Sequence, residues 1–170
     1  SNGIKALKNI LQKEERAWIR AKAALALAKL YVGENKEILD ILLERLEKDD
    51  SVMVRSIIAR GSLAEIHKKA SKDIRKKIDK KIKMANLDPW PRKNSLRIID
   101  VGCQFGEASH GILEYYKKKG FSDAALVGLD MEAVQIIEAE KNKEDPDIVF
   151  ILGDVNKDKF GPADIVFSRN

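Results

Sequence analysis

The stretch LRIIDVGCQFGEASHGI, residues 96–112, decides how the second half of this chain is expected to fold. It opens with a short β-rich run, 96–101, and continues past Gly102 and Gly106 into a segment of helical periodicity, 107–119. Glycine allows tight turning and close backbone approach, and the start of a helix presents unpaired N–H groups. The stretch therefore predicts a strand, a loop and a helix, although a glycine-bearing loop alone does not show that a ligand binds there.

The residues that follow alternate between strand and helix patterns. Short apolar runs cover 124–130, 147–152 and 163–168, and a helical pattern near 132–142 separates the first two. Continuous apolar strands joined through helices are typical of parallel sheets that are covered on both faces. The second half is therefore expected to be an α/β layer fold with four strands.

Polar residues gather where these expected strands end, which is where open parallel sheets bind their ligands. Asp100 lies at the end of the first strand, Asp130 ends the second, and Asp154 follows the third. Asp130 comes 28 residues after Gly102, about one strand–helix–strand unit further along the chain. A carboxylate at that position is placed to accept hydrogen bonds from the two hydroxyls of a ribose.

Four motifs, in order along the chain, carry a family resemblance. IIDVGCQFGEAS (98–109), VGLDME (127–132), ILGDVN (151–156) and ADIVFSRN (163–170) resemble the strand-end motifs of the Rossmann-like, class I S-adenosylmethionine-dependent methyltransferases. The resemblance implies S-adenosylmethionine as cofactor and a sheet of strand order 3-2-1-4. Members of that family close the sheet with three further strands, so the resemblance implies a C-terminally truncated, partial domain here.

The resemblance also implies a set of cofactor-binding residues: Asp100, Gly102, Cys103, Gly106, Asp130, Met131, Asp154 and Val155. Gly102, Cys103 and Gly106 would lie beside the methionine portion and the ribose. Asp130 would hold the ribose hydroxyls, with Met131 flanking the adenine. Asp154 and Val155 would lie at the adenine edge. The motifs identify no catalytic residue.

Plainer interpretations of the same residues stay open. Asp100 could serve merely as a cap for the loop, and Asp154 could belong merely to a turn. Cys103 is expected to be a packing residue, because methyl transfer from a sulfonium needs no thiolate. Gln104 stands where the family commonly has glycine, and a positive φ costs Gln more than Gly. The G-x-G-x-x-G pattern of dinucleotide enzymes fails, because Gln104 and Glu107 replace two of its glycines. A vacant α/β domain is the remaining alternative.

Apolar residues in the first half recur every three or four positions, which predicts helices over 4–13, 15–32, 36–48, 51–69 and 71–85. Two of these carry a degenerate repeat, WIRAKAALALAKL (18–30) and MVRSIIARGSLAEI (53–66). Arg20 matches Arg55 at an offset of 35. Leu27 matches Leu63 at an offset of 36, so the register of the repeat slips by one residue.

Repeated helices of this kind resemble the HEAT repeat family, in which helical pairs stack into a solenoid. The matching features are an Ala-rich packing face and the approach to the second copy, made of Asp49, Asp50, Val54 and Arg55, and they cover about residues 3–68. We therefore expect a HEAT-like helical domain at 1–88, a Pro/Trp linker at 89–94 and the methyltransferase-like domain at 95–170. Trp90 is large enough to pin that linker against one domain.

The two halves differ in charge. Residues 1–85 carry 21 Lys+Arg and 12 Asp+Glu, whereas residues 86–170 carry 11 and 15. Nine basic and two acidic side chains lie between Lys68 and Lys83, most of them on the expected helix 71–85, which has one narrow line of isoleucines. A solvated outer helix, a surface that docks on the acidic half and a surface for nucleic acid all fit this pattern. We expect a protein or nucleic-acid partner, with RNA slightly favoured, although no aromatic side chains interleave the cluster.

The scarcity of cysteine and histidine bounds the chemistry. Cys103 is the only cysteine, which excludes an intrachain disulfide and argues against a zinc site. His67 and His110 have no ligand-like neighbours, so no metal is expected. No run of eighteen apolar residues and no export leader is present, which favours a cytoplasmic, soluble protein without a membrane partner.

These patterns favour the cofactor-binding part of an S-adenosylmethionine-dependent methyltransferase whose helical module positions a macromolecular substrate. The alternative is a non-catalytic helical-repeat scaffold with a vestigial α/β domain. The expected strand 163–168 would lie unpaired at the sheet edge, which invites self-association. Without the further strands, we expect this chain to bind the cofactor weakly or not at all and to be inactive alone.

Overall fold

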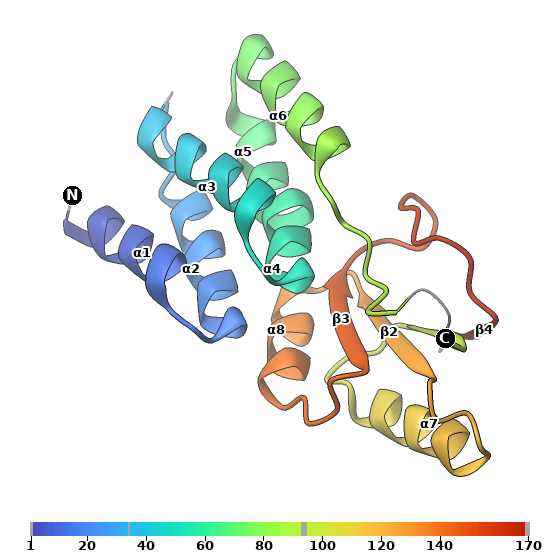
Figure 1. The fold of residues 1–170 in the computed structure, drawn as a ribbon. Coiled ribbons are helices and arrows are strands. Elements are labelled where there is room, and N and C mark those ends of the chain that lie inside the picture. The colour runs from blue at the N-terminus through green and yellow to red at the C-terminus, as the bar shows by residue number, and fades with distance from the viewer. Residues whose placement is uncertain (1, 34, 93–94, 169–170) are drawn as a thin grey trace. The chain divides into compact units, whose positions relative to one another are not determined.

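The chain folds into two compact units, which comprise Ser1–Leu87 and Asp88–Asn170. The computed structural model describes residues 2–33, 35–92 and 95–168 (Figure 1). The first unit consists of helices and the second of a parallel sheet with helices, so the expected fold class is confirmed. None of the helices in these ranges is long and apolar enough to pass through a bilayer.

The helical unit has two layers. Its elements are α1 (Asn2–Lys13), α2 (Ala17–Lys29), α3 (Lys36–Lys48), α4 (Val52–Ile57), the π-helical turn η1 (Ile58–Ser62), α5 (Leu63–Lys69) and α6 (Lys72–Met84). In one layer α3 lies between α1 and α6, and in the other α2 packs on α4, η1 and α5 (Figure 1). Large apolar side chains between the layers are fully buried, among them Leu27, Ile38, Leu42, Ile57 and Leu63. Burial of each such side chain stabilises the fold by about 1.5–3 kcal/mol.

The long helix expected over 51–69 contains a π-helical turn at the place where the repeat slips. The helix begins as expected at Ser51, whose hydroxyl oxygen accepts a hydrogen bond from the backbone N–H of Val54 (3.4 Å). The turn η1 lies between Arg55 and Leu63, the two residues whose repeat offsets differ by one. A π turn closes i→i+5 rather than i→i+4 bonds and so takes up one extra residue. Leu63 therefore reaches the same full burial as Leu27.

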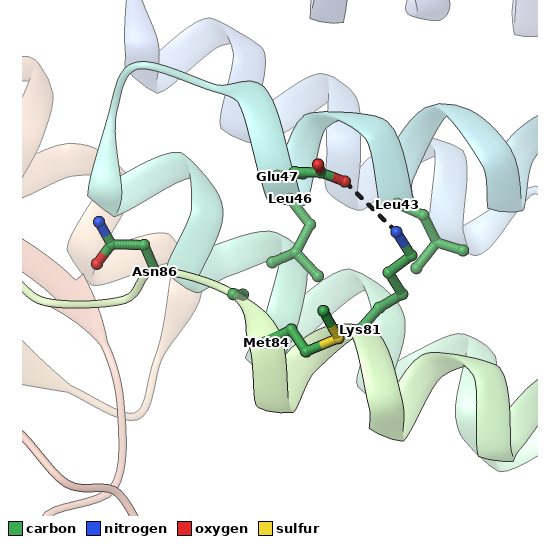
Figure 2. A pocket seen from close by; sticks show the side chains of 7 residues that line it. Leu43, Leu46, Glu47, Lys81, Met84 and Asn86 are labelled. Atoms are coloured by element: carbon green, nitrogen blue, oxygen red, sulfur yellow. Dashed lines mark hydrogen bonds and ion pairs between the residues drawn. The ribbon is translucent and has the colours of Figure 1, made fainter.

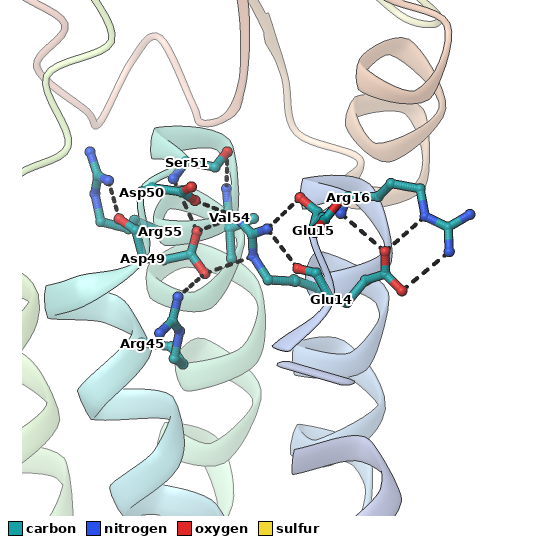
Figure 3. Close-up of polar contacts among 10 residues, drawn as sticks. Glu14, Glu15, Arg16, Arg45, Asp49, Asp50, Ser51, Val54 and Arg55 are labelled. Carbon is teal, nitrogen blue, oxygen red and sulfur yellow. Dashed lines mark hydrogen bonds and ion pairs between the residues drawn. The ribbon is translucent and has the colours of Figure 1, made fainter. Parts of the chain in front are cut away.

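A buried ionic network ties α2 to the turn before α4 (Figure 3). The Arg20 guanidinium donates to both carboxylate oxygens of Asp49, at 3.0 and 2.8 Å. It also donates to the carbonyl oxygens of Glu14 (2.9 Å) and Glu15 (2.8 Å), while Arg45 donates to the Asp49 carboxylate (2.8 Å). The side chains of Arg20 and Asp49 are only 6% and 0% exposed, so this is an interior ion pair.

The network also accounts for the acidic turn that precedes the second repeat copy. Burial opposes ionisation of Asp49, but the hydrogen bonds from Arg20 and Arg45 outweigh it and hold the pKa of this carboxyl below its usual value. Arg55 donates to the Asp49 carbonyl oxygen (2.5 Å), and Asp50 pairs with Arg20 from a side chain that is 85% exposed. Asp49 and its arginines therefore hold the helices together.

The α/β unit is a four-stranded sheet with all pairs parallel. Its elements are β1 (Arg97–Val101), α7 (Glu107–Lys118), β2 (Ala125–Asp130), α8 (Ala133–Lys141), β3 (Ile148–Leu152) and β4 (Ile165–Ser168). The strand order is β3-β2-β1-β4, which confirms the expected 3-2-1-4 order. In register, Asp100 lies opposite Gly128 and Asp130 opposite Leu152. The described part of β4 thus forms one edge of the sheet.

The segment that precedes the sheet packs on the α/β unit. The indole N–H of Trp90 donates to the carbonyl oxygen of Phe160 (2.7 Å), and the Arg97 guanidinium lies 5.1 Å from the centre of the Trp90 ring. Trp90 therefore pins residues 88–92 to this unit, as its size indicated. The last two positions of the expected linker, 93–94, lie outside the described residues.

Candidate functional site

The loop after β1 folds over the end of β2. The backbone N–H groups of Gly102 and Cys103 both donate to the carbonyl oxygen of Leu129, at 2.8 and 3.0 Å. A further bond from the Gly106 N–H to the Cys103 carbonyl oxygen (2.9 Å) closes the loop before α7 begins. The carboxyl ends of β1 and β2 therefore meet under one short loop, at the edge of the sheet where α/β folds bind ligands.

Gln104 lies at the top of this loop in a left-handed conformation. Its φ is 51°, the only positive φ of a non-glycine residue in the described ranges. Its backbone N–H donates to a carboxylate oxygen of Asp130 (3.0 Å). This charge-assisted bond offsets the conformational cost, which explains how the loop keeps a glycine-like turn without glycine.

Asp130 links the loop to the end of β2. Besides the bond from Gln104, its second carboxylate oxygen accepts from the N–H of Glu132 (3.0 Å). The amide of Gln135, oriented with its nitrogen toward Asp130, donates to both oxygens at 2.9 and 3.1 Å. An ionised carboxylate has about four lone-pair positions, so a ligand hydroxyl could replace the Gln135 amide without disturbing the two backbone bonds. Sequence reasoning missed Gln135, because only its place one turn into α8 brings it near Asp130.

Position 106 needs glycine for two reasons: its backbone conformation and the close packing around it. Its φ is +82°, and a Cβ at this position would lie 2.5 Å from the Phe150 ring. A Cβ on Gly128 would lie 2.6 Å from the same ring and 3.1 Å from the Cys103 sulfur. Phe150, on β3, therefore fills the space beneath the loop that both glycines leave. No sequence pattern pointed to Phe150, since its role depends on packing between elements.

Two of the expected site residues lie beneath the surface. Asp100 is fully buried, and its carboxylate accepts a hydrogen bond from the hydroxyl of Ser109 in α7 (2.6 Å). Cys103 is 1% exposed and packs against Gly128, which agrees with a packing role for the thiol. Both residues can shape the loop from below, and neither presents its side chain to solvent.

Other expected site residues present apolar surface at the ends of β2 and β3. Met131 is 70% exposed and follows Asp130 directly, and Val155 is 47% exposed in the turn after β3. Phe105 in the loop is 51% exposed. Exposed apolar side chains at strand ends that also carry a carboxylate are compatible with a small-molecule site.

Asp154 takes part in a local turn. Its carboxylate accepts from the Asn156 N–H (2.9 Å) and pairs with Lys157 (3.0 Å). These two interactions, led by the backbone bond from Asn156, lower the pKa of Asp154. The backbone N–H of Gly153 donates to the Asp130 carbonyl oxygen (3.0 Å), which keeps the turn beside the end of β2.

The helical unit has its own apolar hollow, of about 280 Å³, between α3 and α6 (Figure 2). Leu43 and Leu46 line it from α3, and Met84 lines it from α6. An ion pair between Lys81 and Glu47 (3.4 Å) crosses its rim. The hollow lacks the strand-end residues that the sequence singled out, and no described group of three or more His, Cys, Asp or Glu in either unit could hold a metal ion.

Comparisons with known proteins add little. No protein-family model and no curated protein matches the chain. Among solved structures, it is similar to a protein from Listeria monocytogenes described as a candidate class I S-adenosylmethionine-dependent methyltransferase, with 15% sequence identity and a TM-score of 0.36. The match covers 98% of this chain and 56% of that protein. Similarity at this level supports no conclusion about function, so any functional assignment depends on the geometry of the strand ends.

Proposed function

We propose that the α/β unit is the cofactor-binding part of an S-adenosylmethionine-dependent methyltransferase of the Rossmann-like class. The observation that carries the proposal is the bond between the Gln104 N–H and the Asp130 carboxylate (3.0 Å). It joins the glycine-bearing loop to the acidic end of the neighbouring strand. The first three sequence motifs reach the ends of β1, β2 and β3, and the described part of the fourth covers β4, in a sheet of order 3-2-1-4, which adds support.

The residues at the strand ends fit the cofactor. Asp130 has lone pairs for ribose hydroxyls once the Gln135 amide moves aside. The exposed side chains of Met131 and Val155 offer apolar contacts for an adenine. The backbone of Gly102 and its neighbours would lie along the methionine portion.

The buried members of the set would act indirectly. Asp100 would hold the first turn of α7 through Ser109, and Cys103 would fix the loop by packing. Both would therefore set the shape of the loop without touching the cofactor.

Bound S-adenosylmethionine supplies a methyl group on a positively charged sulfur, which an acceptor can attack in line. The protein then has to bind the cofactor, orient it and exclude water. Asp130 would hold the ribose end, and the loop around Gly102 would hold the end that carries the sulfur.

The helical unit would position a macromolecular substrate as a HEAT-like module. Two findings support this role: the two-layer stack of helices, and the π turn that restores equivalent burial of Leu27 and Leu63 despite the slipped repeat. A scaffold that only binds partners would use the same surfaces, so the cofactor is the discriminating ligand.

Calorimetric titration with S-adenosylmethionine and with its demethylated product tests the proposal. Although the partial sheet is expected to bind weakly at best, the strand-end geometry leads us to expect weak heat of binding from the unmodified chain at high protein concentration. We expect a further loss of affinity of roughly 10- to 100-fold in Asp130→Ala, because hydrogen bonds to a charged group contribute about 1.5–3 kcal/mol each. Asp123→Ala, which removes an exposed carboxylate from the turn before β2, is the matched control and should bind like the unmodified chain.

Two outcomes would overturn the assignment. Absence of heat from the unmodified chain at high concentration would favour the non-catalytic scaffold. Tighter binding of NADH than of either adenosyl ligand would favour a dinucleotide enzyme.

A further inference from the structure

The basic helix α6 divides its charges between two faces. At 3.6 residues a turn, its isoleucines Ile74, Ile78 and Ile82 form the seam that packs on the helical unit. Ile78 is fully buried, and α6 contacts α3 and α5 through this side. The lysines nearest α3 are paired: Lys77 with Asp40 (3.2 Å) and Lys81 with Glu47 (3.4 Å).

Four other lysines of α6 form an outward row. Lys72, Lys76, Lys80 and Lys83 are all exposed, and none makes an ion pair or hydrogen bond with a residue that the structure describes. At about 100° a residue they lie within roughly 80° of the helix circumference, about 160° away from the isoleucine seam. The row extends over about 17 Å at 1.5 Å a residue. We call these four residues the lysine row.

The two carboxylates of α6 flank this row but form no ion pair with it among the described residues. Asp73 lies in the first turn of the helix, where a negative charge stabilises the N-terminal end of the dipole. Asp79 faces His67 of α5, with 3.1 Å between the carboxylate oxygen and Nε2. The lysine row therefore presents four adjacent positive charges that the described fold does not use.

The chemistry of the lysine row favours phosphate over protein. Lysine is depleted at the cores of protein interfaces, where apolar and aromatic anchors supply most of the affinity. The row contains no aromatic or apolar side chain that could act as such an anchor. Lysine is a common phosphate binder, and a duplex carries one negative charge per about 1.7 Å, so a row of about 17 Å can meet a phosphate at every lysine.

We propose that the lysine row binds the sugar–phosphate backbone of a nucleic acid, without reading its sequence. Ammonium groups neutralise phosphates and release counterions, which gives affinity but no base discrimination. The proposal does not depend on methyl transfer, since it concerns side chains of the helical unit alone.

Fluorescence anisotropy with a labelled 16-base-pair RNA duplex tests the proposal across a series of KCl concentrations. Replacement of all four lysines of the row by Gln should weaken binding at least about 30-fold at 0.1 M KCl. It should also reduce the slope of log Kd against log [KCl] by about 3 to 4, close to one for each phosphate that no longer meets a lysine. Replacement of the same four by Arg keeps the charge and should keep the affinity.

A matched control variant separates the effect of the lysine row from the effect of net charge alone. Lys5, Lys13, Lys29 and Lys36 are also exposed and make no ion pair or hydrogen bond with any described residue, but they are spread over α1, α2 and α3. Their replacement by Gln removes the same charge and should change Kd less than about threefold. Circular dichroism of both variants checks that the helices stay folded.

Two results would contradict the proposal. One is an equal loss of affinity in the two Gln variants, which would show that net charge alone attracts the duplex. The other is binding of a poly-glutamate of equal charge number as tight as that of RNA, with the same loss on removal of the row. That outcome would point to an acidic protein as the partner.

Discussion

The two units use their aspartates differently. In the helical unit, Asp49 lies inside the protein, and Arg20 and Arg45 hold its carboxylate. In the α/β unit, Asp130 stands half-buried at a strand end, where a loop N–H and an adjustable amide hold it. The first arrangement stabilises a fold and leaves no position for a ligand. The second leaves acceptor positions at a surface, and this difference is our reason for proposing the strand ends as the functional site.

The largest effect is expected from breaking the ionic network of the helical unit. Asp49→Ala leaves the buried Arg20 without its main partner, which should lower the free energy of unfolding by about 3–5 kcal/mol. Asp50→Ala removes an exposed partner of the same arginine and should cost less than about 1 kcal/mol. Trp18 and Trp90 are the only tryptophans, one in each unit. Denaturant titration of Trp18 fluorescence in a Trp90→Phe background therefore reports the helical unit alone, and equal losses in the two variants would contradict the network.

A somewhat smaller effect is expected from filling the space beneath the loop of the α/β unit. In Gly106→Ala the new Cβ meets Phe150 at 2.5 Å with φ at +82°, so we expect a loss of roughly 2–4 kcal/mol. The matched control is Gly111→Ala in α7, where a Cβ meets nothing within 4 Å. This control should stabilise the unit by about 0.5–1 kcal/mol. Trp90 fluorescence in a Trp18→Phe background measures both changes, and a harmless Gly106→Ala would refute the packing role of Phe150.

The pH dependence of stability gives a further test of the role of Asp49 in the helical unit. Because the pKa of Asp49 is lower in the folded protein than its usual value of 3.8, its contribution is complete well above pH 4 and is lost as the pH falls below that value. The free energy of unfolding of the helical unit should therefore decrease from pH 5 toward pH 3. In Asp49→Asn this decrease should be less steep. An unchanged slope would mean that other carboxyl groups cause the acid sensitivity.

The smallest effect on stability is expected at the π turn η1, which accommodates the one-residue slip between the two repeat copies. Deletion of Gly61 should convert η1 into an ordinary α turn and restore the register of the first repeat copy, at a cost below about 2 kcal/mol. Deletion of Ala24 removes a residue from the regular helix α2, which has no π turn to take up the change. The buried side chains on one side of the deletion therefore rotate by about 100° relative to those on the other side. Thermal unfolding followed by circular dichroism should separate the two deletions clearly. Similar losses would show that the π turn does not compensate for the slip.

Much of the fold followed from local patterns. Continuous apolar runs that carry Asp100 and Asp130 near their ends predicted the parallel strands, and the family resemblance implied the sheet order 3-2-1-4, which the structure has. The expected helix over 15–32 was too long, because α2 ends at Lys29 although Tyr31 beyond it is buried. Burial continues past the helix there, so apolar periodicity alone overestimates its length.

The details of the site depend on packing between elements and could not be read from the sequence. Phe150 meets Gly106 only because β3 packs beside β2, and Gln135 reaches Asp130 only through the turn into α8. Likewise, the sequence showed that α6 is basic but not which lysines are paired. That distinction depends on Asp40 and Glu47 of α3.

The central claim is that the ends of β1, β2 and β3 bind the adenosyl cofactor, and a protein-detected NMR titration tests it most directly. With S-adenosylmethionine added to the ¹⁵N-labelled chain, the backbone amide signals that shift should cluster at 102–106, 130–132 and 153–156. The signals of the helical unit should stay in place. Shifts confined to the residues around the Leu43–Met84 hollow, or no shift up to millimolar cofactor, would contradict the account.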